Sequence, residues 1–232
     1  MTGRRTKLLL VNPNTSTTTT AMMVSAARGT IELLGEDAVV MGATAASGAA
    51  MIVDPAALGL AASASAAAGM AGVEEHRPDA VIVAAFGDPG ATELRAALGI
   101  PVFGIGEASV RKAARGGRFA IVTSTPQLRE ALESLVETHC PTADFAGVFV
   151  PARDPLELAQ DPDRNVEALD GAIDAAVAAG AGCVVIGGGP LTDAARRLAA
   201  RTDVDVVEPV PCAVRLALAT LRSTAAVLAS RP

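Results

Sequence analysis

The stretch DAVIVAAFGDPGATELRAALGIPV, residues 79–102, shows most clearly how strands and helices alternate in this chain. The apolar run VIVAA at 81–85 is followed by a Gly-Asp-Pro-Gly turn, an alanine- and leucine-bearing helical stretch and a second apolar run. A strand without polar alternation is typical of a parallel sheet covered by helices on both faces. The segment is therefore predicted to be a βαβ unit, with a tight turn at the carboxyl end of its first strand. Ala84 and Ala85, at that strand end, carry no reactive group.

The same alternation continues along the chain and predicts an α/β fold with mostly parallel sheets flanked by helices. Strands are predicted at 7–12, 38–43, 79–85, 101–104, 118–123, 146–150, 183–187 and 204–207. Helices are predicted at 17–34, 55–76, 90–98, 107–115, 126–138, 164–180, 191–201 and 211–229. Residues 181–207 repeat the plan of 79–102. This echo fits two related lobes that face each other across a cleft, and it equally fits two unrelated βαβ units.

Composition excludes several classes of function. The 232 residues include no Trp or Tyr and only five Phe, and the net charge of -6 is spread without a basic stripe, which argues against a nucleic-acid partner. The alanine-rich segment 56–72 is predicted to be a buried helix rather than a membrane span. The apolar run at 8–11 is too short for a signal peptide, so a cytoplasmic location is expected. The three Cys and two His are scattered, which argues against a metal site or a disulfide framework.

Two segments place amides at strand ends. VNPNTS at 11–16 follows the first strand, and one Asn or Ser suffices to cap the next helix. Because Asn12 and Asn14 offer more polar groups than a cap needs, at least one is predicted to bind substrate. In the turn after residue 84, Phe86 and Gly87 offer backbone N–H groups suited to a carboxylate or oxyanion, whereas Asp88 is predicted to cap the next helix.

Two further segments place hydroxyls and glycines at strand ends. VTSTP at 122–126 carries three hydroxyl residues, of which Thr123 and Ser124 are predicted to face a ligand. IGGGPLTD at 186–193 lacks the Gly-Lys-Ser/Thr of a phosphate-binding loop and is predicted to form a tight anion-binding turn. Cys212 is the only thiol near a predicted helix start, where a helix dipole lowers a thiol pKa, although an inert buried Cys remains the alternative.

These segments, in this order, resemble the aspartate/glutamate/hydantoin racemase superfamily, and within it the hydantoin racemases. The matching stretches are VNPNTS, AAFGDPG, PVFGIGEAS at 101–109, FAIVTSTPQ at 119–127, GGGPL and EPVPCAVRLA at 208–217. The resemblance implies two pseudo-symmetric lobes with a cleft between them, here divided as 1–108 plus 208–232 and 109–207. It also implies a reaction without cofactor or metal, in which one cysteine on each side of the cleft moves the Cα proton.

The sequence departs from this pattern at both cysteines. The first cysteine of the family falls on Ala85, and the second falls on Gly188 or an immediate neighbour. No His, Lys or carboxylate replaces either in the same segment, so racemisation by two thiols cannot be the mechanism. The groups left to bind substrate are the amides and side chains of Asn12, Asn14, Ser47, Ala85, Phe86, Gly87, Thr123, Ser124, Gly188, Gly189 and Pro190. Those left for catalysis are Thr44, Ser124, Glu208 and Cys212.

Three functions remain open at this point. A polarised carbonyl without an opposed base pair favours ring-opening hydrolysis of a hydantoin-like cyclic ureide. Isomerase or lyase chemistry with a single proton donor is the second alternative, and a catalytically inactive ligand-binding protein is the third. The expected partners are a small-molecule substrate and further copies of this chain, because relatives in the family are commonly dimers or larger; no nucleic acid or membrane partner is expected.

Overall fold

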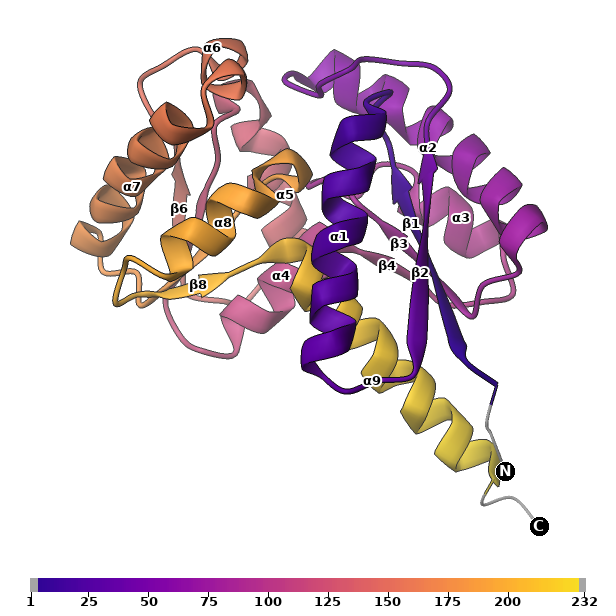
Figure 1. Cartoon of the computed structure of the whole chain (residues 1–232). Helices are drawn as coiled ribbons and strands as arrows, with labels where there is room; N and C mark the ends of the chain where they lie inside the picture. Colours follow the sequence, from indigo (N-terminus) through magenta and orange to yellow (C-terminus); the bar gives the residue numbers. More distant parts are fainter. Residues whose placement is uncertain (1–3, 230–232) are drawn as a thin grey trace.

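Eight parallel strands form two separate four-stranded sheets in the computed structural model, which describes residues 4–229 (Figure 1). The first sheet has the order β2 (Ala38–Thr44), β1 (Thr6–Asn12), β3 (Ala80–Val83) and β4 (Val102–Gly104). The second has the order β6 (Phe145–Phe149), β5 (Phe119–Val122), β7 (Cys183–Ile186) and β8 (Asp205–Val207). The predicted α/β fold with two lobes is confirmed, and the two sheets repeat one strand order.

Helices connect the strands and cover the sheets, as a parallel sheet requires. In the first lobe these are α1 (Thr17–Leu33), α2 (Pro55–His76), α3 (Ala91–Ala97) and α4 (Ile105–Ala114). In the second they are α5 (Arg129–His139), α6 (Pro155–Gln160), α7 (Pro162–Ala178) and α8 (Thr192–Ala199), with short 3₁₀ turns at Pro126–Leu128 and Gly189–Leu191. The last helix, α9 (Pro209–Ala229), packs against α1, α4 and β3 of the first lobe.

The predicted strands and helices are present, with ends shifted by a few residues, but two features near residue 155 were not predicted. Helix α6 is additional, and α7 begins at Pro162 rather than at 164. Each helix starts with an Asp-Pro pair: Asp154 and Asp161 accept hydrogen bonds from backbone N–H groups of the first turn, and a proline follows each. An acidic N-cap followed by proline is a strong helix start, which explains both differences.

The alanine-rich helix α2 is a surface helix rather than the buried helix that its composition predicts. Only one face packs on the sheet, through Ala61, Ala64, Ser65, Gly69 and Gly72. The other face exposes Leu60 and Met70 at 69% and 44% of their surface. By length and composition alone α2 and residues 209–227 of α9 could cross a membrane, a test that core helices of other proteins also pass.

The first lobe and the second lobe touch through the loops that follow β3 and β7. A Cβ atom at Gly189 would lie 2.4 Å from the Ala84 carbonyl oxygen and 2.8 Å from the Met23 sulfur, so only glycine fits there. The predicted lobe boundary at residue 108 falls inside α4, which contacts α9 as well as α5 and β7 of the second lobe. The division into residue ranges therefore stays a prediction.

Candidate functional site

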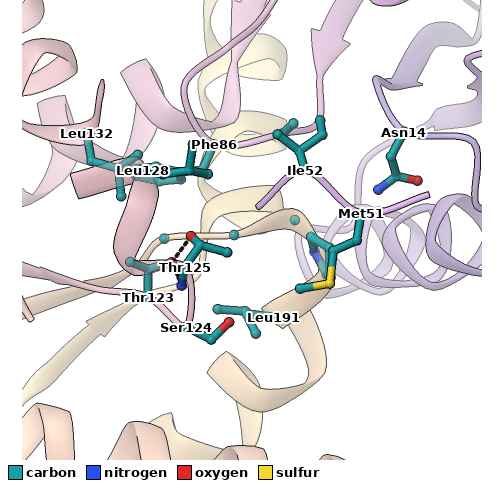
Figure 2. Close-up of a pocket in the computed structure, with 15 residues that line it drawn as sticks. Asn14, Met51, Ile52, Phe86, Thr123, Ser124, Thr125, Leu128, Leu132 and Leu191 are labelled. Carbon is teal, nitrogen blue, oxygen red and sulfur yellow. Dashed lines mark hydrogen bonds between the residues drawn. The ribbon is translucent and has the colours of Figure 1, made fainter. Parts of the chain in front are cut away.

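A small pocket lies where the loops after β1, β3, β5 and β7 converge between the lobes (Figure 2). Such a place, outside the carboxyl ends of parallel strands, is where open α/β sheets bind ligands. Its volume is about 40 Å³, room for a few water molecules. The lining residues come from both lobes: Asn14, Met51, Ile52, Ala85, Phe86, Thr123, Ser124, Thr125, Leu128, Leu132, Gly187, Gly188, Gly189, Pro190 and Leu191.

The two asparagines of the first loop have different tasks. Asn12 is fully buried, and its amide nitrogen donates to Asn14 Oδ1 at 2.8 Å and to the Ser16 carbonyl and Thr20 hydroxyl at 3.0 Å. Asn14 lines the pocket, and its Oδ1 also accepts from the Ser16 N–H at 2.9 Å. Within residues 4–229 no acceptor bonds Asn14 Nδ2, which Figure 2 draws on the side of the other lining residues. Asn12 therefore holds Asn14, and Asn14 offers the free donor.

The hydroxyl segment after β5 supplies a second polar wall. Thr123 and Thr125 share a hydrogen bond of 3.0 Å between their hydroxyls, drawn as a dashed line in Figure 2. The Ser124 hydroxyl has no hydrogen-bond partner among the described residues, although the residue is only 3% exposed. None of the three side chains caps the following 3₁₀ turn. The segment therefore presents its hydroxyls to the pocket, and Thr125 joins the two that were predicted.

The glycine-containing loops contribute backbone donors unevenly. The N–H groups of Asp88, Gly187 and Gly188 donate to backbone carbonyls within the chain. In contrast, the N–H groups of Ala85, Phe86, Ser124 and Gly189 have no partner among the described residues, and all four residues line the pocket. Gly87 adopts φ +102° in the turn but does not line it. Unpaired N–H groups at a pocket wall are suited to a carbonyl or carboxylate oxygen.

The two positions at which the resemblance implies cysteines both line the pocket, one from each lobe. Ala85 follows β3, and Gly188 follows β7. Gly188 has extended backbone geometry, and the atoms nearest to a Cβ there would be those of the Leu191 side chain, at 3.1 Å. A Cβ atom at Gly188 would therefore be accommodated by a small shift of the flexible Leu191 side chain.

No ionisable side chain lines the pocket in the part of the chain that the structure describes. The nearest acidic residue in the loop, Asp88, does not cap its own helix as predicted, because Gly90 is the N-cap residue of α3. Its carboxylate instead accepts the N–H groups of Gly106 at 2.8 Å and Glu107 at 2.7 Å, which caps α4. Burial raises the pKa of Asp88 to about 7, against the effect of those two donors.

The four residues predicted for catalysis do not come together. Only Ser124 lines the pocket. The Thr44 hydroxyl lies 2.7 Å from that of Thr20, away from the pocket lining, and Ser47 is exposed in the loop after β2. Glu208 and Cys212 line a different cavity, of about 380 Å³, between α4, β8 and α9.

Cys212 has the properties of an inert thiol. Its sulfur lies 3.3 Å from the Ala108 carbonyl oxygen, to which it donates. Burial raises the pKa of Cys212 to about 11, although Lys112, Arg215 and Arg115 oppose the shift. Burial also raises the pKa of Glu208. A thiol with such a pKa is protonated at neutral pH, so Cys212 serves neither as a nucleophile nor as a base.

The apolar part of the pocket could not be read from the sequence. Met51 and Ile52 lie in the loop between β2 and α2, and Leu128, Leu132 and Leu191 lie at helix starts after β5 and β7. No periodicity marks a loop residue as ligand-facing, and a leucine in a helix is ordinarily a core residue. Among the polar lining residues, Thr125 was also missed, although the run of three hydroxyl residues at 123–125 was an available signal.

The chain is thus a two-lobed α/β protein with a pocket between the lobes that is lined by unpaired backbone N–H groups and hydroxyl side chains. The family model for Asp/Glu/Hydantoin racemase matches residues 8–217, and the chain therefore belongs to this family. Hydantoin racemase from Paenarthrobacter aurescens is 32% identical over 145 residues, which are 62% of this chain and 61% of that protein. The chain thus matches about three fifths of the length of that curated relative.

Solved structures extend the similarity over nearly the whole chain. Allantoin racemase from Pseudomonas fluorescens is 27% identical with a TM-score of 0.87, and the match covers 94% of this chain and 92% of that one. Allantoin racemase from Klebsiella pneumoniae is 25% identical with a TM-score of 0.86, covering 94% and 89%. Each of these relatives is described as a racemase.

Proposed function

We propose that the pocket binds a hydantoin-type cyclic ureide, or a related amino-acid-derived carbonyl compound, and promotes proton exchange at the carbon beside a polarised carbonyl. The observation that carries this proposal is the composition of the pocket wall: free amide and hydroxyl donors from both lobes and no ionisable side chain among the described lining residues. Membership of the racemase family and the similarity to hydantoin and allantoin racemases support the substrate class.

Asn14 Nδ2, the Ser124 hydroxyl and the unpaired N–H groups of Phe86 and Gly189 are the donors available to a ring carbonyl. Such donors stabilise the oxyanion of an enolate more than the neutral carbonyl, and so make the adjacent C–H more acidic. Water or a buffer base removes that proton, and a proton from solvent returns to either face. Without a thiol on each face, this exchange is slower than in a two-base racemase.

Ring-opening hydrolysis, the leading expectation from the sequence, starts from the same polarised carbonyl. It needs a group that activates water, and the described lining residues include no carboxylate or imidazole for this task. The named relatives are racemases rather than hydrolases. We therefore favour proton exchange, and hydrolysis is an outcome that the same experiment detects.

The test uses single enantiomers of 5-substituted hydantoins and of allantoin in D₂O, followed by proton NMR and polarimetry. Loss of the C5–H signal and of optical rotation, faster than in buffer alone and with the ring intact, is the expected result. Appearance of a carbamoyl amino acid, the product of ring opening, would contradict the proposal and show that the protein is a hydrolase. Binding without exchange would show that the protein binds the ligand but does not catalyse the reaction. The absence of both binding and turnover across the panel would overturn the proposal.

A further inference from the structure

The cavity between α4, β8 and α9 has a volume of about 380 Å³ and no role in the proposed reaction. It shares no lining residue with the interlobe pocket. Helix α4 packs along α9 of the first lobe and also contacts β8 of the second, so both lobes contribute walls (Figure 1). We call it the basic cavity, because four of its lining residues are cationic: Arg111, Lys112, Arg115 and Arg215.

The basic cavity gathers positive charge in a chain whose net charge is -6. Two acidic residues, Asp205 and Glu208, line it against the four cations. Arg111 has a counter-ion, because its guanidinium pairs with Glu107 of the same helix at 3.0 Å. The side chains of the other three cations form no ion pair or hydrogen bond with any described residue, the two lining carboxylates included. Unpaired like charges repel one another, and a bound anion would relieve that repulsion.

The three unpaired cations surround one part of the wall. Lys112, Arg215 and Arg115 each act to lower the pKa of the Cys212 thiol, so their charges all lie around that sulfur. The last turn of a helix favours cations, which accounts in part for Lys112 and Arg115 at the end of α4. Arg215 lies near the start of α9, where the helix dipole gives a cation no such stabilisation. Its position beside the other two is therefore better explained by a ligand.

The three cations are also accessible to a ligand. Lys112, Arg115 and Arg215 are exposed residues at the wall of an open cavity. The rest of the wall is largely apolar and is formed by Ala108, Val206, Val207, Pro211, Leu216 and Ala219. The volume lies within the range of small-molecule sites, so there is room for an organic body beside the anionic group.

The charges of the wall indicate which anion fits. A phosphate monoester has up to two negative charges and three free oxygens, so it can face three cations from two helices at once. A carboxylate has two oxygens, which a single arginine satisfies. Asp205 and Glu208 would repel a second anionic group on the same ligand, which disfavours polyphosphates and nucleic acids.

We propose that the basic cavity is a second binding site, which takes a phosphate monoester with an uncharged organic body. The phosphate lies among Lys112, Arg115 and Arg215, and the body lies against the apolar wall. This inference goes beyond the proposed function and does not depend on it, because the two sites have no lining residue in common.

Calorimetric titration at low ionic strength with phenyl phosphate, inorganic phosphate, benzoate and phenol tests the assignment. The unmodified protein is expected to bind phenyl phosphate at least about tenfold more tightly than each of the other three compounds. In Lys112→Gln/Arg215→Gln, which removes one cation from each helix, affinity for phenyl phosphate is expected to fall at least about tenfold. Both residues are exposed, and thermal unfolding confirms that the variant is folded.

Arg28→Gln/Arg153→Gln is the matched control. It removes the same number of charges from exposed arginines that have no partner among the described residues and line no part of the basic cavity. It is expected to bind phenyl phosphate as the unmodified protein does. Inorganic phosphate bound as tightly as phenyl phosphate would mean an adventitious ion only and would overturn the proposal. Tighter binding of benzoate, unchanged affinity in Lys112→Gln/Arg215→Gln, or an equal loss in both double variants would overturn it as well. None of these results bears on hydantoin binding in the interlobe pocket.

Discussion

Asn12 Nδ2 donates a hydrogen bond of 2.8 Å to Asn14 Oδ1. This bond orients the Asn14 amide so that its Nδ2 stays free to donate to a ligand in the pocket. Both asparagines belong to one loop after β1, but their surroundings separate their tasks. All polar atoms of the Asn12 side chain are used inside the chain, whereas Asn14 accepts two bonds at Oδ1 and keeps Nδ2 free. The pair therefore combines a structural residue with a ligand-binding residue.

Asn14→Asp tests the role of the free donor. The substitution keeps the shape of the side chain and an oxygen to accept from Asn12 and Ser16, but it replaces Nδ2 by a charged oxygen. Ligand affinity, measured by calorimetric titration with a hydantoin, is expected to fall at least tenfold, because a carbonyl would face a carboxylate. Asn12→Ala is the contrasting variant: it is expected to lower the free energy of unfolding by about 1–3 kcal/mol by leaving buried partners unpaired. Unchanged affinity in Asn14→Asp would exclude the donor role.

The two residues that stand where the resemblance implies cysteines, Ala85 and Gly188, lead to a prediction of increased proton exchange when cysteines are introduced there. In Ala85→Cys/Gly188→Cys a thiol would be introduced from each lobe, at positions where the chain now has Ala85 and Gly188. The double variant is expected to increase the rate of C5–H exchange by about 10²–10⁴ over the unmodified protein, the usual contribution of a positioned acid and base. Each single variant supplies only one of the two groups and is expected to racemise far more slowly than the pair. Proton NMR in D₂O measures the exchange rate of all four proteins under one condition. Equal rates in the double variant and the unmodified protein would contradict the inference that positions 85 and 188 lie on opposite sides of the bound ligand.

Much of this architecture could be predicted from the sequence because local signals and global fold agree. The apolar runs of β3, β5 and β7 and their glycine, proline and hydroxyl turns identified the strand ends, and those ends meet between the lobes. Asp88 was assigned to the wrong helix because capping was judged from neighbours in the sequence. Its φ of +51° turns the carboxylate toward α4, eighteen residues further along the chain from Asp88 to Gly106.

The site was only partly predictable for the same reason. Glu208 and Cys212 follow a strand end, as the true lining residues do, but that strand is the edge strand β8. Only tertiary packing of α9 against α4 decides that they line another cavity.

Cys212→Ala and Glu208→Gln test whether the second cavity takes part in the reaction. Both residues line the cavity between α4, β8 and α9 rather than the interlobe pocket. Ligand affinity and exchange rate are therefore expected to stay within about twofold of the unmodified protein, a change smaller than the ordinary effect of one lost hydrogen bond. Thermal unfolding of each variant controls for folding. A tenfold loss of the exchange rate in either variant, with ligand affinity retained, would show that the substituted residue takes part in catalysis.

The buried carboxyl group of Asp88 is expected to make the stability of the protein depend on pH. Burial raises the pKa of Asp88 to about 7 from an ordinary value near 4, so between these values the unfolded chain has lost a proton that the folded chain keeps. Stability contributed by this group is complete below about pH 4 and is lost as the pH rises toward 7, with a steepest slope of about 1.4 kcal/mol per pH unit. Asn is also a good N-cap and does not titrate, so Asp88→Asn removes this slope while it keeps an acceptor for α4. Urea unfolding of both proteins from pH 4 to pH 8 is expected to give a free-energy difference, unmodified minus variant, that falls as the pH rises. A difference that rises with pH would mean that the two N–H donors of Gly106 and Glu107 outweigh burial and hold the carboxylate ionised.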